Sequence, residues 1–269
     1  MTHIPERHTP DRWISRLGLG TRGQARKWIE ERRLSIPDFG PVRSVEQVIP
    51  ASPSGPPVFL LDGNPLLPSL PLVLALNKPR GVVSTRQDPG GRAVPSDLLR
   101  SLPGVRDRPD IDSIVPIGRL DRASAGLILL SNRPTDLNAL LNPDLGILRE
   151  YRVQVRPSLS EEHSRALSSG DWAREWGFRS PVVRIERKNP RSTWVRISLT
   201  EGKNREIRKP FEQEGYEILH LVRVRFGPFF LSSLSPGSVS DVTAWFYRSG
   251  RFELYIILDA LRRGDIIEL

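Results

Sequence analysis

Apolar residues recur along this chain with two different periods, and each period predicts a different kind of element. Over residues 11–33 they recur at helical spacing on both sides of a glycine-rich turn, which predicts two short helices, the second capped by Thr21. Strict alternation over Arg149–Arg156 and Thr193–Leu199 predicts two half-buried strands. The apolar run over 72–76 predicts a short buried strand.

The remaining stretches divide the chain. Residues 49–71 are rich in proline, serine and glycine, which predicts a linker around one short strand at 58–61. A loop is predicted over 102–112, and a helix is predicted to open after Ser158 or Ser160 and to end near Gly170. Because strands dominate, we expect an α+β fold with mostly antiparallel pairing.

Three segments follow from this division. A small helical or α+β module with its linker is expected over 10–66, and a domain built on a mixed, mostly antiparallel sheet over 70–245. The tail, 246–269, is of open role. Apolar residues there predict an amphipathic helix that ends at Gly264, namely Phe252, Tyr255, Ile256, Leu258 and Leu261.

Charge adds a class of partner. The 269 residues carry 40 Lys plus Arg against 31 Asp plus Glu, a formal net charge of +9, and only five of those cations are lysines. Arginine forks match phosphate and stack on bases, so the balance suggests nucleic acid, although a genomic bias would also favour Arg over Lys. The absence of cysteine excludes disulfides, cysteine zinc sites and thiol catalysis. With no apolar run of membrane length and no secretory signal, we expect a soluble cytoplasmic protein.

One stretch, 117–132, places a single acid, Asp121, among small residues and arginines directly before an apolar run. This arrangement holds one carboxylate at the mouth of a rigid strand, with cationic neighbours that favour its ionised form. An aspartate that merely caps a turn before a core strand would give the same local pattern.

The whole string resembles the catalytic motif of the ribosomal-RNA pseudouridine synthases of the RsuA/RluB type, in which the aspartate is essential. The resemblance implies that Asp121 is the nucleophile, that Tyr151 is the active-site aromatic and that Arg208 pairs with Asp121. Segments 77–85, 149–153, 201–209 and 221–228 resemble further signatures in the family's order. Together with 12–34, the resemblance covers 72–243.

The N-terminal hairpin resembles the S-four-type RNA-binding module, named after a small-subunit ribosomal protein. Between Arg12 and Arg33 there are seven cations and two acids, which suits phosphate contact, although a basic hairpin without an RNA role has the same composition. Across the chain we expect RNA contacts from Arg16, Arg22, Arg26, Lys27, Arg32, Arg33, Lys78, Arg80, Arg119, Lys203, Asn204, Arg205, Arg223 and Arg225.

The chemistry explains these residue types. Isomerisation breaks the glycosidic bond and rejoins the base through carbon five, and a covalent route needs a carboxylate nucleophile. Whether Asp121 attacks the ribose or the uracil stays open. The base must leave its helix, and no metal or organic cofactor is expected. The expected partner is ribosomal RNA or a subunit assembly intermediate, first of the large and then of the small subunit, for a monomeric enzyme.

Two other functions, and one difference from the family pattern, have to be weighed against this interpretation. A glycoside hydrolase or nuclease would need paired carboxylates or metal ligands, and the close pair Asp110 and Asp112 sits in a proline-rich loop. A non-catalytic RNA-binding or assembly protein is the alternative. Its best argument is Pro210, where the family has an apolar residue: a helix capped by Asn204 would meet this proline in its interior, unless the helix begins at Pro210.

Overall fold

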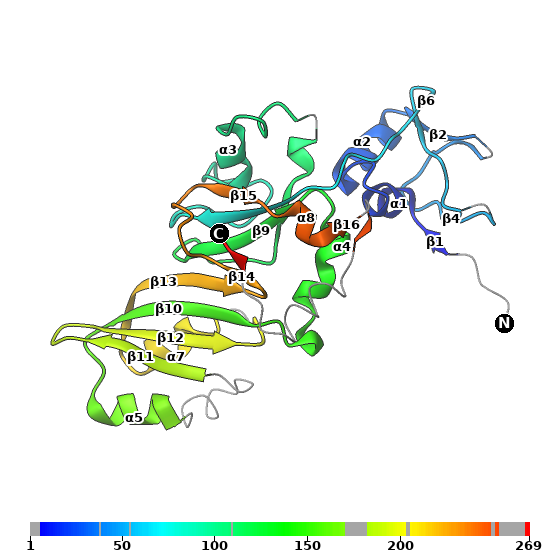
Figure 1. Ribbon diagram of the computed structural model, residues 1–269. Helices are drawn as coiled ribbons and strands as arrows, with labels where there is room; N and C mark the ends of the chain where they lie inside the picture. Colours follow the sequence, from blue (N-terminus) through cyan, green and yellow to red (C-terminus); the bar gives the residue numbers. More distant parts are fainter. Residues whose placement is uncertain are drawn as a thin grey trace.

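The computed structural model describes residues 6–37, 39–53, 55–108, 110–169, 182–202, 205–248, 251–252 and 267–269. It has two lobes, with the N-terminal module on one side and a larger sheet domain on the other (Figure 1). Within the described part of the chain, every helix is too short or too polar to span a bilayer.

The N-terminal module packs a helical hairpin against short strands. A capping box starts its second helix, because Thr21 accepts from the Gln24 amide and the Gln24 side chain accepts from the Thr21 amide. The core includes Trp13, Ala25 and Phe59. The elements are β1 (Arg7–His8), α1 (Pro10–Arg16), α2 (Arg22–Glu30), β2 (Leu34–Ile36), β3 (Gly40–Pro41), β4 (Ile49–Pro50), β5 (Leu60–Leu61) and β6 (Asn64–Pro65).

The predicted linker over 49–71 is largely wrong. Strand β4 pairs with β1, and β5 and β6 join the four-stranded sheet β3-β2-β5-β6 of the module. Phe59, inside the predicted linker, is fully buried in the module core. The chain passes from one lobe to the other in the stretch after β6.

The larger domain is built on a ten-stranded sheet whose main path runs β11-β12-β10-β13-β9-β7-β15. All its strand pairs are antiparallel except β13 with β9 and β14 with β18, so the predicted α+β class is confirmed. Its strands are β7 (Val73–Lys78), β8 (Val115–Ile117), β9 (Ala125–Ser131), β10 (Arg149–Arg156), β11 (Val182–Lys188), β12 (Thr193–Leu199), β13 (Glu217–Phe226), β14 (Phe229–Phe230), β15 (Val239–Asp241) and β18 (Ile267–Glu268).

Helices cover both faces of this sheet. Leu74 and Ile128 pack with α3 and η1 on one face, while Val73 and Leu129 pack with α4, η2 and α8 on the other. Both faces of the central strands are therefore dry, which explains the unbroken apolar run in β7. The covering elements are α3 (Pro95–Arg100), η1 (Ile111–Ser113), α4 (Pro134–Leu137), η2 (Asn138–Leu141), η3 (Pro143–Leu145), α5 (Glu161–Ser169), α7 (Arg208–Gln213) and α8 (Thr243–Phe246).

The predicted strands β10 and β12 have the predicted bounds, and the helix expected after Ser160 is α5. The expected tail helix lies mostly outside the described residues. Phe252 contradicts it, because it pairs in the hairpin of β16 (Tyr247–Arg248) with β17 (Arg251–Phe252). Strand β18 pairs with β14, so the last residues complete the main sheet.

Gly126 allows the two halves of the sheet to join. It lies at φ 105° and pairs in parallel with Arg223 of β13. A Cβ at this position would lie 2.3 Å from the Arg223 carbonyl oxygen, a distance that no side chain can occupy. This close approach places the loop before β9 beside the pocket-lining residues of β10 and β13.

Candidate active site

A pocket of about 930 Å³ opens where the two halves of the sheet meet. The loop between β8 and β9 contributes Asp121 and Ser124, β10 contributes Tyr151, and α7 contributes Arg208. Three of the separated sequence segments therefore converge on one cavity, as the motifs predict.

Asp121 and Arg208 face one another in this pocket. Arg208 Nε lies 3.5 Å from Asp121 Oδ2, with the aspartate side chain 41% exposed and the arginine side chain 9% exposed. Burial lowers the pKa of Arg208, and the charge of Asp121 opposes that shift. An arginine guanidinium stays protonated in proteins, so the side chain carries a positive charge. A carboxylate open to the pocket and a cation fixed behind it is the arrangement that a nucleophilic aspartate needs.

Ser124 aims Arg208. Its hydroxyl accepts from Arg208 Nη2 at 3.2 Å, and its amide donates to the Asp121 carbonyl at 2.9 Å. The serine is only 2% exposed. One buried residue thus connects the aspartate's backbone to the arginine's side chain.

A second loop supports the backbone on both sides of Asp121. Ser84 donates to the Leu120 carbonyl at 2.8 Å and accepts from the Leu120 amide at 3.1 Å. The Gly81 amide donates to the Arg122 carbonyl at 2.8 Å. These bonds hold the residues that flank Asp121 to the loop that follows β7.

Lys78 holds that supporting loop through hydrogen bonds to its backbone. It is completely buried, and its Nζ donates to the carbonyls of Pro79 at 3.0 Å and Val82 at 2.9 Å. Burial lowers the pKa of Lys78 to about 8, against the raising effect of Asp121. The expectation that Lys78 binds RNA is therefore wrong, because its ammonium is covered by the fold.

Pro210 does not disturb the geometry of Arg208. Helix α7 begins at Arg208, so Pro210 is its third residue. The amides of the first turn have no partner within a helix, and proline is tolerated there. Neither predicted start, Arg205 or Pro210, is correct, and the observed start removes the objection that Pro210 raised.

Tyr151 lies beside Arg223 on the neighbouring strand, and both line the pocket. Arg223 is 3% exposed, donates through Nε to the Leu127 carbonyl at 2.7 Å and lies over the Phe226 ring. Arg223 was predicted to contact RNA, but its guanidinium is largely covered by the fold, so it does not offer an exposed charge to the phosphate backbone. Arg225 is partly covered, bonds the Gly227 carbonyl and lies 3.8 Å from Glu150.

Arg149, which was not among the predicted site residues, is also buried. It donates to the carbonyls of Ile147 at 2.8 Å and Leu140 at 3.1 Å. Ser84 was missed in the same way. A charged residue at the first position of an alternating strand was the feature that could have identified Arg149. Nothing in the sequence indicates where the hydroxyl of Ser84 points.

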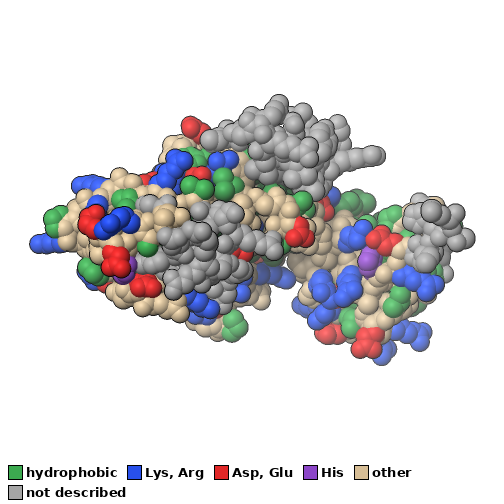
Figure 2. Space-filling view, turned by 90° about the horizontal axis from the view of Figure 1, so that it is seen from below, with side chains coloured by type: hydrophobic (Ala, Val, Ile, Leu, Met, Phe, Trp, Pro, Cys, Tyr) green, Lys and Arg blue, Asp and Glu red, His purple; other side chains and the backbone are tan. Residues whose placement is uncertain are grey.

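Most of the other predicted RNA-contacting cations are exposed, and many are paired with acids. Figure 2 shows Lys and Arg side chains spread over the smaller lobe and interleaved with acidic ones. Arg22 and Arg26 bind Asp11, Arg16 binds Glu6, Arg33 binds Asp62 and Glu31, Lys27 lies 3.7 Å from Glu31, and Arg205 binds Glu212.

Four predicted cations and Asn204 remain. Arg32 and Arg119 are exposed, and Arg119 lines the pocket mouth. Arg80 is exposed and donates to the Leu219 carbonyl at 3.3 Å. Lys203 and Asn204 lie outside the described residues. Among the residues that the structure describes, no cluster of three or more His, Asp or Glu could hold a metal ion.

Comparison with known proteins agrees with this geometry. A family model described as RNA pseudouridylate synthase matches residues 72–213. The chain is 32% identical over 237 residues to ribosomal large subunit pseudouridine synthase B of Pseudomonas aeruginosa, covering 86% of this chain and 58% of that protein. It is 30% identical over 219 residues to the protein of the same name from Salmonella typhi, covering 80% of this chain and 72% of that one.

A solved structure shares the fold. A crystal structure of a pseudouridylate synthase superimposes with a TM-score of 0.55 at 22% sequence identity, covering 88% of this chain and 96% of that chain. The matched segment, 72–213, contains Asp121, Tyr151 and Arg208 and makes up over half of the sequence. This chain therefore belongs to the RNA pseudouridylate synthase family.

Proposed function

We propose that this protein converts a uridine of large-subunit ribosomal RNA into pseudouridine, with Asp121 as the nucleophile. The observation that carries the proposal is the pair formed by Asp121 and Arg208 in an open pocket inside the segment that the family model matches. The large subunit is favoured because the relatives compared above are named for it.

The residues divide the work as follows. The C1′–N1 bond of the uridine breaks, the base turns, and a C1′–C5 bond forms, while the proton on C5 is lost and N1 gains one. Asp121 forms the covalent intermediate with the ribose or with the uracil ring. Arg208 stabilises the carboxylate, and Tyr151 offers a stacking surface to the flipped base and a hydroxyl near the transferred proton. No step requires a cofactor.

The N-terminal module supplies RNA affinity in this proposal. Its exposed arginines attract the phosphate backbone, and the catalytic domain selects the base. Ribosomal RNA or a subunit assembly intermediate in the cytoplasm is the proposed partner. One copy of the chain contributes every residue named, so a monomer suffices.

The test uses unmodified transcripts of large- and small-subunit ribosomal RNA. Each is incubated with the protein, and pseudouridine is mapped by carbodiimide-stop primer extension, with Asp121→Asn as the matched isosteric control. We expect one new stop on the large-subunit transcript that is absent with Asp121→Asn. A stop on the small-subunit transcript alone would reassign the substrate.

The alternative is an RNA-binding or assembly protein that keeps the synthase fold without catalysis. It predicts salt-sensitive RNA binding with no stop on either transcript. It also predicts that Asp121→Asn still performs the cellular role. Either result would refute the catalytic proposal.

A further inference from the structure

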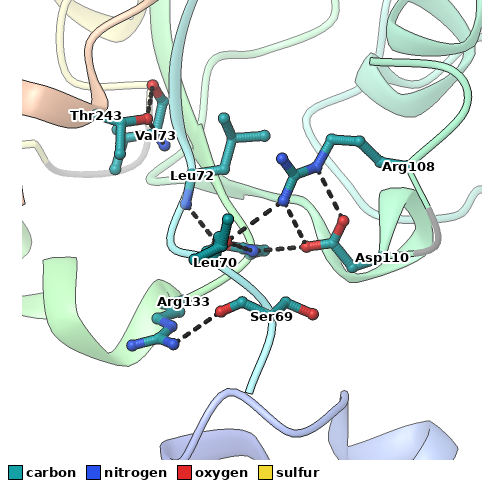
Figure 3. Close-up of polar contacts among 9 residues, drawn as sticks. Ser69, Leu70, Leu72, Val73, Arg108, Asp110, Arg133 and Thr243 are labelled. Atoms are coloured by element: carbon teal, nitrogen blue, oxygen red, sulfur yellow. Dashed lines mark hydrogen bonds and ion pairs between the residues drawn. The ribbon is translucent and has the colours of Figure 1, made fainter. Parts of the chain in front are cut away.

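The junction between the two lobes is built from directional polar contacts. Figure 3 shows the connecting segment passing between Arg108, Asp110 and Arg133 of the catalytic domain, with a helix of the module below it. The two lobes have separate apolar cores. Their relative orientation therefore depends on hydrogen bonds. A hydrogen bond requires a particular angle, whereas apolar burial has no preferred direction.

Asn132 extends the central sheet with its side chain. The ladder between β7 and β9 ends at the pair Val73 and Ser131. One residue further on, the Asn132 amide accepts from the Leu72 amide at 2.9 Å and donates to the Leu70 carbonyl at 2.8 Å. A side-chain amide has the donor and acceptor of a peptide group, so it continues the ladder where the backbone has turned away.

Asp110 and Arg108 lock this contact. Asp110 accepts from Asn132 Nδ2 at 2.6 Å and from Arg108 Nε at 2.9 Å, and Arg108 also donates to the Leu70 carbonyl at 3.3 Å. Burial by itself would raise the pKa of Asp110, but the bonds from Arg108 and Asn132 outweigh it, and the pKa lies below its usual range. The carboxylate is therefore charged and keeps Asn132 in one orientation.

Ser69 is bonded to both lobes at once. Its amide donates to the Gly18 carbonyl of the module at 3.2 Å, and its carbonyl accepts from Arg133 Nη2 of the catalytic domain at 2.8 Å. Gly18 lies against the same guanidinium, since a Cβ there would be 2.9 Å from Arg133 Nε. No free residue separates the last contact to the module from the first contact to the catalytic domain.

A second bridge lies beside this junction. Arg86 Nη1 donates at 3.2 Å to Thr21 Oγ1, the hydroxyl that caps α2. The module is thus held at its glycine turn from two directions, by Arg133 and by Arg86. Two separated bridges restrict rotation as well as distance.

We propose that Arg133, beside the contact that Asn132 makes with the connecting segment, is a specificity-determining positioning residue, which holds the module at a set distance and angle from Asp121. This proposal rests on the proposed function. The RNA segment bound by the module then fixes which uridine reaches the pocket, so the enzyme selects its target by geometry as well as by the base itself.

The test begins with a distance measurement that needs no RNA. Because the sequence contains no cysteine, spin labels can be attached at single cysteines replacing the exposed Glu30 of α2 and Glu162 of α5 and read by double electron–electron resonance. We expect one narrow distance distribution that broadens in Arg133→Ala and in Gly18→Ala. Arg191→Ala, an exposed arginine of the β11–β12 turn, is the matched control and leaves it narrow.

The second readout is modification of the mapped uridine in the large-subunit transcript and in a short hairpin around it. In Arg133→Ala and Gly18→Ala we expect kcat/KM to fall about 10- to 100-fold on the transcript, as for a misplaced substrate, and to stay unchanged on the hairpin. A broad distribution in the unaltered protein, no broadening in either variant, or equal losses on both RNAs would overturn the proposal. Absence of pseudouridine with the unaltered protein would instead refute the proposed function, while the distance measurement still tests the junction.

Discussion

Two arginines of the module and two of the pocket have different kinds of partner. In the module, Arg22 and Arg26 are half exposed and share one buried acid, Asp11. In the pocket, Arg149 and Arg223 are buried and bond backbone carbonyls. Exposed pairs contribute little to stability and exchange partners readily, whereas burying a guanidinium is costly and its hydrogen bonds to the fold offset part of that cost.

This difference separates two tasks that the net charge of the chain conceals. Loosely paired cations suit a phosphate backbone whose position varies, because the ion pairs can open when RNA arrives. Fixed cations suit a reacting carboxylate, since catalysis depends on charges that are already in place. In the proposed function, arginine therefore attracts RNA in one lobe and supports the reaction in the other.

The largest contrast is expected from exchanging arginine for lysine in both lobes. Arg208→Lys cannot reach Ser124 and Asp121 together, because an ammonium is a single point of charge. We expect the single-turnover rate constant to fall about 100-fold, which is the effect of losing one hydrogen-bond donor to a transition state. Arg26→Lys, whose acid is also held by Arg22, is the control and keeps kcat. Near-native turnover in Arg208→Lys would contradict the assigned pairing.

A smaller effect is expected from removing the hydroxyl that aims Arg208. Ser124→Ala loses one buried hydrogen bond, which corresponds to about tenfold in kcat with KM unchanged. Ser124→Thr keeps the hydroxyl and restores the rate. Ser101→Ala, at an exposed serine, is the control. If alanine and threonine at position 124 act alike, the arginine is positioned by other contacts.

The buried Lys78 makes the stability of the folded protein depend on pH. Since the pKa of Lys78 is about 8 in the folded protein and 10.5 in an exposed lysine, the unfolded chain binds more protons between these values, and stability rises with pH across this window. Relative to Lys78→Met, the free energy of unfolding should rise by about 0.7 kcal/mol between roughly pH 7.5 and 8.5. Urea titrations of both proteins measure this, and parallel curves would show that Lys78 does not titrate there.

The smallest effect is expected at the surface of the module. Arg32→Gln removes one exposed charge, so RNA affinity should fall about twofold at moderate salt and the slope of log affinity against log salt should decrease by about one. Filter binding over a salt series measures both. Arg191→Gln, far from the module, should leave the slope unchanged, and an equal change in both variants would show a nonspecific response to net charge.

The sequence predicted the elements whose burial alternates and missed those whose polarity is misleading. Strands β10 and β12 show their inward faces in every second residue, so their bounds are as expected. The strands that include Pro50 and Pro65 were assigned to the linker because proline is excluded from most strands, although short edge strands tolerate it.

The site shows the same division. Asp121, Tyr151 and Arg208 were found because their motifs carry the family resemblance, and the structure brings them to one pocket. Lys78 was assigned to RNA because a lysine after an apolar run resembles an exposed strand end. Its burial depends on the loop that folds over it, and contacts between distant segments leave no periodic signal in the sequence.

The parallel pairing of β9 with β13 also determines when the protein can first act. Residues 125–126 meet residues 222–223, so the pocket needs two stretches that are separated by almost a hundred residues of synthesis. A nascent chain carries Asp121 long before Arg208 and β13 exist, and contacts of such separation form late. The proposed activity therefore requires that synthesis has passed β13, so a nascent chain that carries only Asp121 has no assembled pocket.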